Sequence, residues 1–225
     1  MSDKPLKLLD LYCGRWGWSK AFAKRGWECI GIDLVSPPDV PEGCTFVQAN
    51  ILDIDTDYVK QFDFICASSP CEQFSVHGMK HFHPNPPYPE LGLKLFNHTR
   101  AILESAGIPY VMENVRAAQQ FVGNAVHHSG PFYLWGNAVP PLLNQGIKKN
   151  IDVGSSKEIK KLPREKLAEY RKQFPWAWSG HKSKARDSLT AEVATIPLEL
   201  ANCVADYAER IIEQRQKVSK GGGAE

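Results

Sequence analysis

The sequence predicts an α/β protein with a Rossmann-like, doubly wound and mostly parallel sheet, which carries a small basic insertion. Three observations indicate this fold class. Short apolar runs alternate with helical segments, a glycine turn follows the first run, and acidic or polar residues end several of the runs. Because the carboxyl ends of parallel strands lie at one edge of a sheet, we expect the functional site at that edge.

The first elements are a strand, a turn, a helix and a second strand. Residues 8–12 are apolar and end at Cys13-Gly14. Residues 19–25 then predict a helix that Gly26 closes. Residues 28–32 predict the second strand, which ends at Asp33.

The same alternation continues along the chain. A long helix is predicted over 91–106, and a final amphipathic helix over 197–214 is expected to pack back on the sheet. The remaining strands are predicted over 45–49, 62–67, 109–112 and 132–135.

These elements divide the chain into four parts. We expect a catalytic domain over 1–139, a basic recognition region over 140–188, a returning helix over 189–216 and a flexible tail over 217–225. Residues 76–90 are rich in proline and lack a period, which is typical of a binding loop or lid.

The composition is that of an ordinary soluble globular protein, with 43% hydrophobic and 23% charged residues in 225. No segment approaches the roughly 20 apolar residues that span a membrane, and residues 1–7 do not resemble a signal peptide. The six cysteines include no C-x-x-C pair, so we expect neither a disulfide framework nor a metal site. We therefore expect a cytoplasmic protein without a membrane or an obligate protein partner.

The charge is unevenly distributed. The net charge is only +2, but residues 148–187 hold 12 Lys and Arg against 5 Asp and Glu. A compact basic segment on a mildly acidic body indicates a polyanionic partner. A solvated charged helix over 157–172 remains the alternative interpretation.

The turn between the first strand and helix predicts a nucleoside-containing cofactor. Gly14 and Gly17 lie where the strand meets the helix, and Asp33 ends the next strand, where a carboxylate can accept hydrogen bonds from ribose hydroxyls. The spacing differs from that of a nicotinamide-binding turn. Glycines that serve only the turn remain the alternative.

Two further strand ends carry reactive side chains. Cys71 follows Pro70 at the end of one strand, where it is placed to attack an electrophilic carbon. Glu113 ends the next strand, and a partly buried glutamate can donate a proton to a ring nitrogen. A buried structural cysteine is the alternative for Cys71.

Taken in order, these motifs resemble those of the S-adenosylmethionine-dependent cytosine-C5 methyltransferases. The family motif Asp-Leu-Phe-x-Gly-x-Gly-Gly is similar to residues 10–17, Pro-Cys-Gln-x-Phe-Ser to 70–75, and Glu-Asn-Val to 113–115. The resemblance covers residues 8–115 in order, and 124–136 and 191–207 more loosely.

The resemblance implies roles for individual residues. Cys71 would be the nucleophile, Glu113 the proton donor to a flipped-out cytosine, S-adenosylmethionine the cofactor and DNA the partner. The implied cofactor-binding residues are Asp10, Tyr12, Gly14, Gly17, Trp18, Ser19, Asp33, Leu34, Asn50, Ile51 and Pro70. The implied substrate-binding residues are Ser75, Asn114, His127, His128, Lys182 and Arg186.

The sequence departs from the family pattern at three places. Trp16 replaces a motif glycine, so a large ring is expected to alter the approach of the backbone to the cofactor. Glu72 replaces a glutamine and puts a carboxylate beside the nucleophile. The family's Gln-x-Arg-x-Arg motif has no arginine here, so either His127, His128 or Arg186 takes its place, or the enzyme is weak, or its substrate differs.

Two other functions remain open at this stage. One is a related methyltransferase acting on RNA, which would keep the same nucleophile and Glu-Asn-Val motif. The other is a non-catalytic protein of this fold that binds nucleic acid. The small size suits a phage or mobile-element enzyme that protects DNA from restriction, which is a hypothesis about its biological context.

Overall fold

The computed structural model describes residues 4–75, 89–141, 143, 146–147 and 195–221. Most of the predicted irregular loop, most of the basic region and the end of the predicted tail lie outside these residues. Lys182 and Arg186 lie outside them as well.

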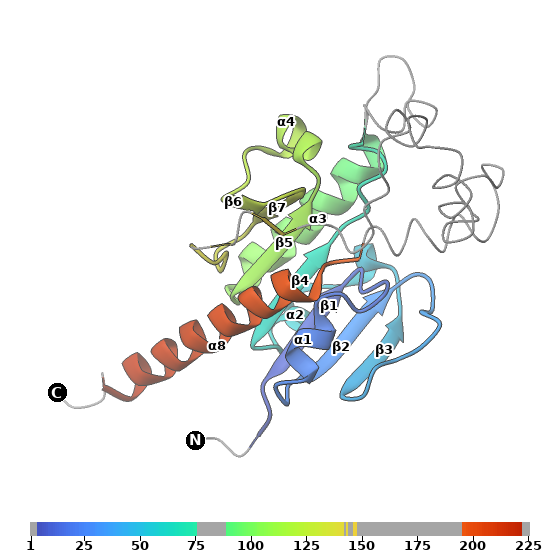
Figure 1. Ribbon diagram of the computed structural model, residues 1–225. Coiled ribbons are helices and arrows are strands. Elements are labelled where there is room, and N and C mark those ends of the chain that lie inside the picture. Colours follow the sequence, from blue (N-terminus) through green and yellow to red (C-terminus); the bar gives the residue numbers. More distant parts are fainter. Residues whose placement is uncertain (1–3, 76–88, 142, 144–145, 148–194, 222–225) are drawn as a thin grey trace, which may run out of the picture.

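Within the described residues, seven strands form one sheet in the order β3-β2-β1-β4-β5-β7-β6 (Figure 1). The first five are mutually parallel, and β7 is antiparallel to both of its neighbours, so the predicted fold class is confirmed. The order reverses at β1 and β4, which is where sheets of this kind bind ligands. The strands are β1 (Lys7–Leu11), β2 (Glu28–Asp33), β3 (Cys44–Gln48), β4 (Phe64–Ser68), β5 (Tyr110–Asn114), β6 (His127–Ser129) and β7 (Phe132–Trp135).

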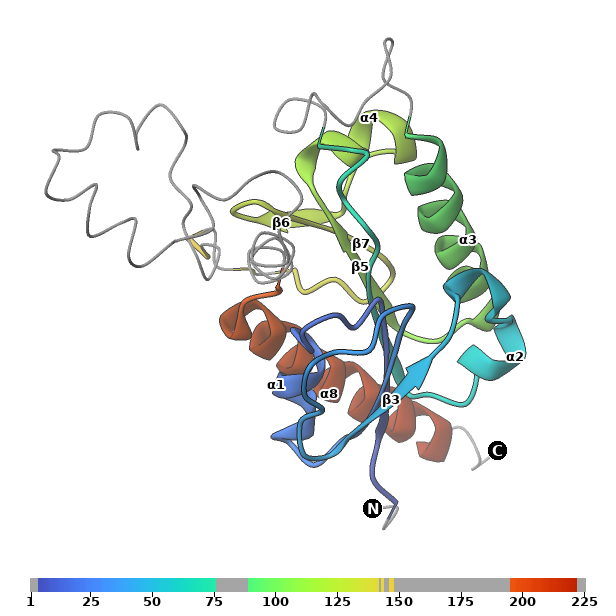
Figure 2. The same ribbon diagram turned by 90° about the vertical axis from the view of Figure 1, so that its right-hand side faces the viewer.

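Helices cover both faces of the sheet. Figure 2 shows α1 and α8 on one face and α2 and α3 on the other. The helices are α1 (Ser19–Ala23), α2 (Thr56–Val59), α3 (Glu90–Ala106), α4 (Gln119–Val122) and α8 (Leu198–Gly221), with short 3-10 turns η1 (Ile51–Asp53) and η3 (Arg116–Ala118).

Two apolar cores separate these layers. Successive side chains of a strand point to opposite faces, so Leu8 packs in the core under α1 and α8, and Leu9 packs in the core under α3. Both side chains are fully buried. A sheet that is covered on both faces requires apolar residues along the whole strand, which explains the continuous apolar runs in the sequence.

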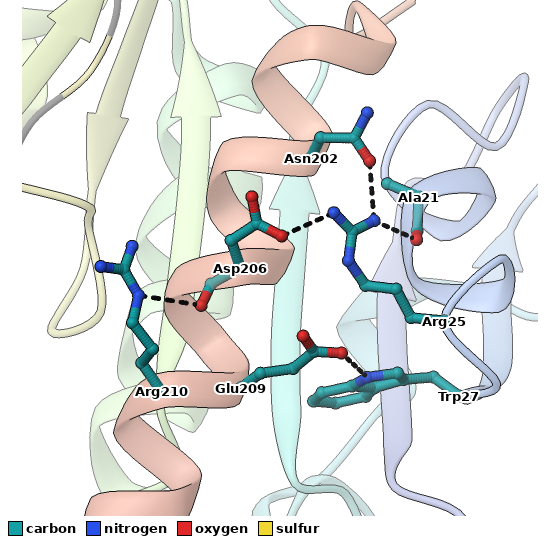
Figure 3. A network of polar contacts seen from close by, with 7 residues as sticks. All are labelled: Ala21, Arg25, Trp27, Asn202, Asp206, Glu209 and Arg210. Atoms are coloured by element: carbon teal, nitrogen blue, oxygen red, sulfur yellow. Dashed lines mark hydrogen bonds and ion pairs between the residues drawn. The ribbon is translucent and has the colours of Figure 1, made fainter.

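The C-terminal helix is fastened to the start of the chain (Figure 3). The Arg25 guanidinium donates 2.7 Å hydrogen bonds to Asn202 and to the Asp206 carboxylate. The Trp27 indole donates to the Glu209 carboxylate at 3.2 Å. These hydrogen bonds join α8 to the segment between α1 and β2.

Several predicted boundaries were wrong. The last helix continues to Gly221, so residues 217–221 are helical and not part of a flexible tail. The first helix ends at Ala23, and β5 extends through Asn114, so Glu113 and Asn114 lie within a strand. No sequence pattern predicted β6, whose three residues form a hairpin with β7.

Two further observations concern the chain as described. None of its helices is long and apolar enough to cross a membrane. All six cysteines belong to this part of the chain, and none of them forms a disulfide.

Candidate active site

The turn after β1 has an unusual backbone. Tyr12, Gly14 and Trp16 have positive φ angles of 61°, 47° and 63°. Only glycine adopts this conformation without steric cost, so Trp16 is a strained residue in the position where the family motif has glycine. The turn is held against β2 by a 3.1 Å hydrogen bond from the Cys13 amide to the Ile32 carbonyl.

The Trp16 side chain packs inside the protein and is only 1% exposed. Its ring lies over Gly31, where an added Cβ would come within 2.2 Å of Trp16 Cζ3. The indole also lies edge-on to Phe46, with ring centres 6.3 Å apart, and its N–H donates a 2.9 Å hydrogen bond to the Asp39 carbonyl. The missing side chain of Gly31 thus makes room for the large side chain of Trp16, and the ring does not lie on the exposed surface of the turn.

The exposed surface of the turn lies at Gly14. An added Cβ there would meet only the Tyr12 carbonyl, at 3.8 Å. The Asp33 carboxylate accepts hydrogen bonds from the Gly14 amide at 3.1 Å and the Val35 amide at 3.2 Å. Leu34 is 60% exposed beside it. A carboxylate keeps further acceptor capacity after two bonds, so an open polar and apolar surface adjoins the turn.

Asp10 supports the turn from inside. Its Oδ2 accepts bonds from the Ser19 hydroxyl at 2.6 Å and the Ser19 amide at 3.2 Å, which fixes the start of α1. Burial raises the pKa of Asp10 to about 7, and the nearby Asp33 charge adds to the effect, while the Ser19 hydrogen bonds oppose it. Among the described residues, its Oδ1 has no hydrogen-bond partner.

Tyr12 connects the turn to α3. Its hydroxyl lies 3.0 Å from the Thr99 hydroxyl, and burial raises the pKa of Tyr12 to about 12. The Asn50 side chain accepts a bond from the Leu52 amide and begins η1. Of the predicted cofactor residues, the structure buries Asp10, Trp18, Ser19 and Ile51, and it leaves at least partly exposed Tyr12, Gly14, Gly17, Asp33, Leu34, Asn50 and Pro70.

The ends of β4 and β5 bring the two predicted catalytic residues to one edge. Ser68, the last residue of β4, is paired with Glu113 in β5, and Cys71 follows three residues later. Neighbouring strands are about 4.8 Å apart, so Cys71 and Glu113 belong to the same small region. Both residues are partly exposed, and Glu72 beside Cys71 is exposed.

A tight turn presents Cys71. Its carbonyl accepts hydrogen bonds from the Phe74 amide at 3.1 Å, and from the Ser75 amide and hydroxyl at 3.0 Å each. Phe74 is fully buried and anchors the turn in the core under α3. The predicted substrate residue Ser75 therefore holds the backbone conformation of Cys71.

Asn114 fastens the catalytic turn to β5. It is fully buried, and its amide group donates to both the carbonyl and the hydroxyl of Ser69 at 3.0 Å. Its side-chain oxygen accepts the Val115 amide at 2.8 Å. In this structure the predicted substrate residue Asn114 makes its contacts within the protein.

The register of the hairpin distinguishes the two histidines. His127 is paired with Leu134, which is paired with Glu113, so His127 and Glu113 lie in one row across three strands. His128 lies in the next row and stacks on Tyr133, with ring centres 4.8 Å apart. His127 is therefore the one that the sheet aligns with Glu113.

Sequence reasoning missed four residues that shape the site. Ser68, Ser69 and Gly31 gave no recognisable pattern beyond their small size. Ile196 lies so close to Gly17 that an added Cβ on Gly17 would be 2.8 Å from Ile196 Cβ. The looser resemblance of residues 191–207 to the family was the one hint of this contact.

A separate pocket of about 630 Å³ lies beside α1. It is lined by Gly17, Lys20, Trp27, Glu42 and Ile196, among others, and by neither Cys71 nor Glu113. The chemistry expected of the chain therefore belongs to the strand ends and not to this pocket.

A sequence model of the C-5 cytosine-specific DNA methylase family matches residues 6–128, which is more than half of the chain. The chain belongs to this family. The match includes the glycine turn, Cys71, Glu113 and both histidines. The predicted family is confirmed, and the chain carries a cytosine-C5 methyltransferase domain. A search of curated proteins found no significant match.

Solved structures of similar fold include two Dnmt2 proteins. A Spodoptera frugiperda DNMT2 mutant is 22% identical over 51% of this chain and 37% of its own, with a TM-score of 0.36. The S. pombe Dnmt2 methyltransferase is 18% identical over 52% of this chain and 36% of its own, with a TM-score of 0.37. A third similar structure, the Burkholderia thailandensis 1,6-didemethyltoxoflavin-N1-methyltransferase with bound S-adenosylhomocysteine, is 17% identical over 59% and 54% of the two chains, with a TM-score of 0.33. The chain thus spans little more than a third of the Dnmt2 proteins, and the family assignment rests on the sequence match.

Proposed function

We propose that the chain is a DNA cytosine-C5 methyltransferase that uses S-adenosylmethionine and a covalent cysteine adduct. The observation that carries this proposal is the pairing of Ser68 with Glu113, because it brings Cys71 and Glu113 together beside the glycine turn. Neither residue alone would distinguish a catalytic site from ordinary strand ends.

The residues around the turn fit S-adenosylmethionine. The surface at Gly14 is open, the Asp33 carboxylate can accept bonds from ribose hydroxyls, and Leu34 offers exposed apolar surface to a ring. Asn50 and Pro70 are partly or fully exposed at neighbouring strand ends. Asp10, Trp18, Ser19 and Ile51 would support this surface from below, because they are buried. When bound, the cofactor supplies a methyl group on a positively charged sulfur.

Two side chains would make C5 of cytosine nucleophilic. The Cys71 thiolate adds to C6 of the ring, while Glu113 donates a proton to N3, so that electron density moves onto C5. After the methyl group has been received, N3 returns its proton to Glu113, a base takes the C5 proton, and the Cys71 thiolate leaves C6, which restores the aromatic ring. His127, in the row of Glu113, is the nearest candidate on the hairpin to hold the base in place of the family's arginines.

Double-stranded DNA hides the atoms on which this chemistry acts. The target cytosine must leave the base stack before Cys71 can reach C6. The basic residues between 148 and 187, including Lys182 and Arg186, supply charge for contacts with phosphates.

The test is methyl transfer from labelled S-adenosylmethionine to duplex DNA, single-stranded DNA and tRNA in parallel, followed by nucleoside analysis. We expect 5-methylcytosine in duplex DNA. Product confined to tRNA would replace the proposed substrate with RNA. Binding of nucleic acid without product in any of the three would indicate the non-catalytic alternative.

A further inference from the structure

Ser68 and Ser69, which precede Pro70 and Cys71, accept hydrogen bonds from two different parts of the protein. From β5, Asn114 donates two 3.0 Å hydrogen bonds to Ser69. From the glycine turn, the Trp18 indole donates a 2.9 Å hydrogen bond to the Ser68 hydroxyl. The backbone leading to Cys71 is therefore fixed both to the strand of Glu113 and to the turn proposed to bind the cofactor.

We propose that Trp18 is a positioning residue, which acts through Ser68 to align Cys71 with the cofactor turn. This inference rests on the proposed function and gives Trp18 a different role from the cofactor contact expected from the sequence. The Trp18 ring is 1% exposed and belongs to the core under α1 and α8. Its indole N–H is directed to Ser68 and not to the open surface of the turn.

The position of this bond suits such a role. Trp18 follows Gly17 directly, so any displacement of the turn displaces the indole. Ser68 ends β4, and only Ser69 and the rigid Pro70 separate it from Cys71. Because Trp18 packs tightly, a change in the turn is passed to Ser68 and is not absorbed by side-chain rotation.

The chain contains a matched comparison. Trp27 is another buried tryptophan in the same core, and its indole donates a 3.2 Å hydrogen bond to Glu209. This bond fastens α8 and touches neither β4 nor the catalytic turn. Replacement of Trp27 by phenylalanine therefore has a similar effect on packing but no path to Cys71.

The experiment compares Trp18→Phe, Ser68→Ala, the double variant and Trp27→Phe in the full-length protein. Substrate and cofactor are those that support methyl transfer by the wild type. Turnover at saturating cofactor, cofactor affinity and the rate of covalent adduct formation with 5-fluorocytosine DNA are measured, together with the melting temperature.

We expect Trp18→Phe to lower kcat and the rate of adduct formation roughly 2- to 10-fold, as loss of one hydrogen bond allows. Cofactor affinity should change less. Ser68→Ala should have a similar effect, and the double variant should be no slower than the slower single variant. A further variant, Ser68→Thr, should keep the wild-type rate because it keeps the hydroxyl. Trp27→Phe should leave kcat unchanged.

Two results would overturn the inference. One is a loss of kcat in Trp18→Phe no greater than in Trp27→Phe. The other is weaker cofactor binding with unchanged kcat, which would return Trp18 to the cofactor-binding role. An inactive wild type would instead contradict the proposed function, so the two failures can be told apart.

Discussion

The turn after β1 and the loop after β4 lie at the same edge of the sheet, but they are stabilised by different means. The β1 turn depends on backbone conformation and buried volume, with Trp16 at positive φ and its ring over Gly31. The β4 loop depends on hydrogen bonds, from Trp18 to Ser68 and from Asn114 to Ser69. The candidate site thus has two parts: the β1 turn, which is stabilised by packing, and the β4 loop, which is stabilised by hydrogen bonds.

The difference shows how each half tolerates change. A bulky residue in a glycine position is accommodated where a neighbour lacks a side chain, as at Gly31. A hydrogen-bonded loop has stricter chemical requirements, because a buried donor that loses its acceptor is costly. We therefore expect substitutions in the β1 turn to act mainly on stability and those in the β4 loop mainly on the reaction.

The largest expected effect is that of Cys71→Ala. It should abolish methyl transfer because the adduct with C6 cannot form, while nucleic-acid binding and the melting temperature stay near wild type. Cys203→Ala on α8 is the matched control and should remain active. Wild-type turnover by Cys71→Ala would show that another residue is the nucleophile.

Glu113→Gln should have the next largest effect. Loss of a general acid costs roughly 100- to 10,000-fold in kcat, and the glutamine keeps the size of the side chain. Single-turnover methyl transfer is the measurement, with the exposed Glu213→Gln on α8 as the control. A decrease of less than about threefold would place the proton donor elsewhere.

Gly31→Ala tests the packed half of the site. Its new Cβ would overlap the Trp16 ring, so we expect a loss of about 1 to 3 kcal/mol in the free energy of unfolding, measured by urea denaturation. In a Trp16→Ala background the same substitution should cost much less. Equal costs in the two backgrounds would mean that Trp16 and Gly31 are not packed against each other.

The last expected effect, that of Asp10, is on stability and depends on pH. Its pKa is raised from 3.8 to about 7 in the folded protein, so between these values the folded state binds more protons than the unfolded state. Stability should therefore fall as pH rises from about 4 to 7, by at most about 1.4 kcal/mol per pH unit from this group.

Asp10→Asn removes this titration. The difference in unfolding free energy between wild type and Asp10→Asn should change across that pH range and level off above about pH 7. The exposed Asp53→Asn serves as the control. A difference that stays constant with pH would show that Asp10 titrates at its ordinary value.

The sequence predicted the sheet because each strand and its adjoining turn are local features. The apolar composition of residues 8–12 and 28–32 predicts a strand at each place. Asp33 indicates the end of the second strand, and no knowledge of long-range contacts is needed to see this. The same holds for the placement of Cys71 and Glu113, since parallel strands bring their ends together.

The packing and hydrogen bonds around the candidate site could not be predicted, because they join residues that are far apart in the sequence. Nothing local in Gly31 indicates that it makes room for Trp16, and nothing local in Ser68 indicates that an indole reaches it. The row that joins His127 to Glu113 requires the register of a hairpin whose first strand has only three residues. Trp18 shows the limit most clearly, because the family resemblance implied that it binds the cofactor, whereas its side chain is buried.

The contact between Gly17 and Ile196 has a consequence for biosynthesis. The β1 turn is synthesised well before the segment that closes on it, and the hydrogen bonds from Arg25 and Trp27 to α8 span 177 to 182 positions. At about 5 to 20 residues per second, translation separates the two halves of this contact by roughly 10 to 35 s. A nascent chain therefore holds Cys71 and the β1 turn for this time before Ile196 can close on Gly17, so we expect the proposed methyl transfer to begin only after α8 has been synthesised and has packed.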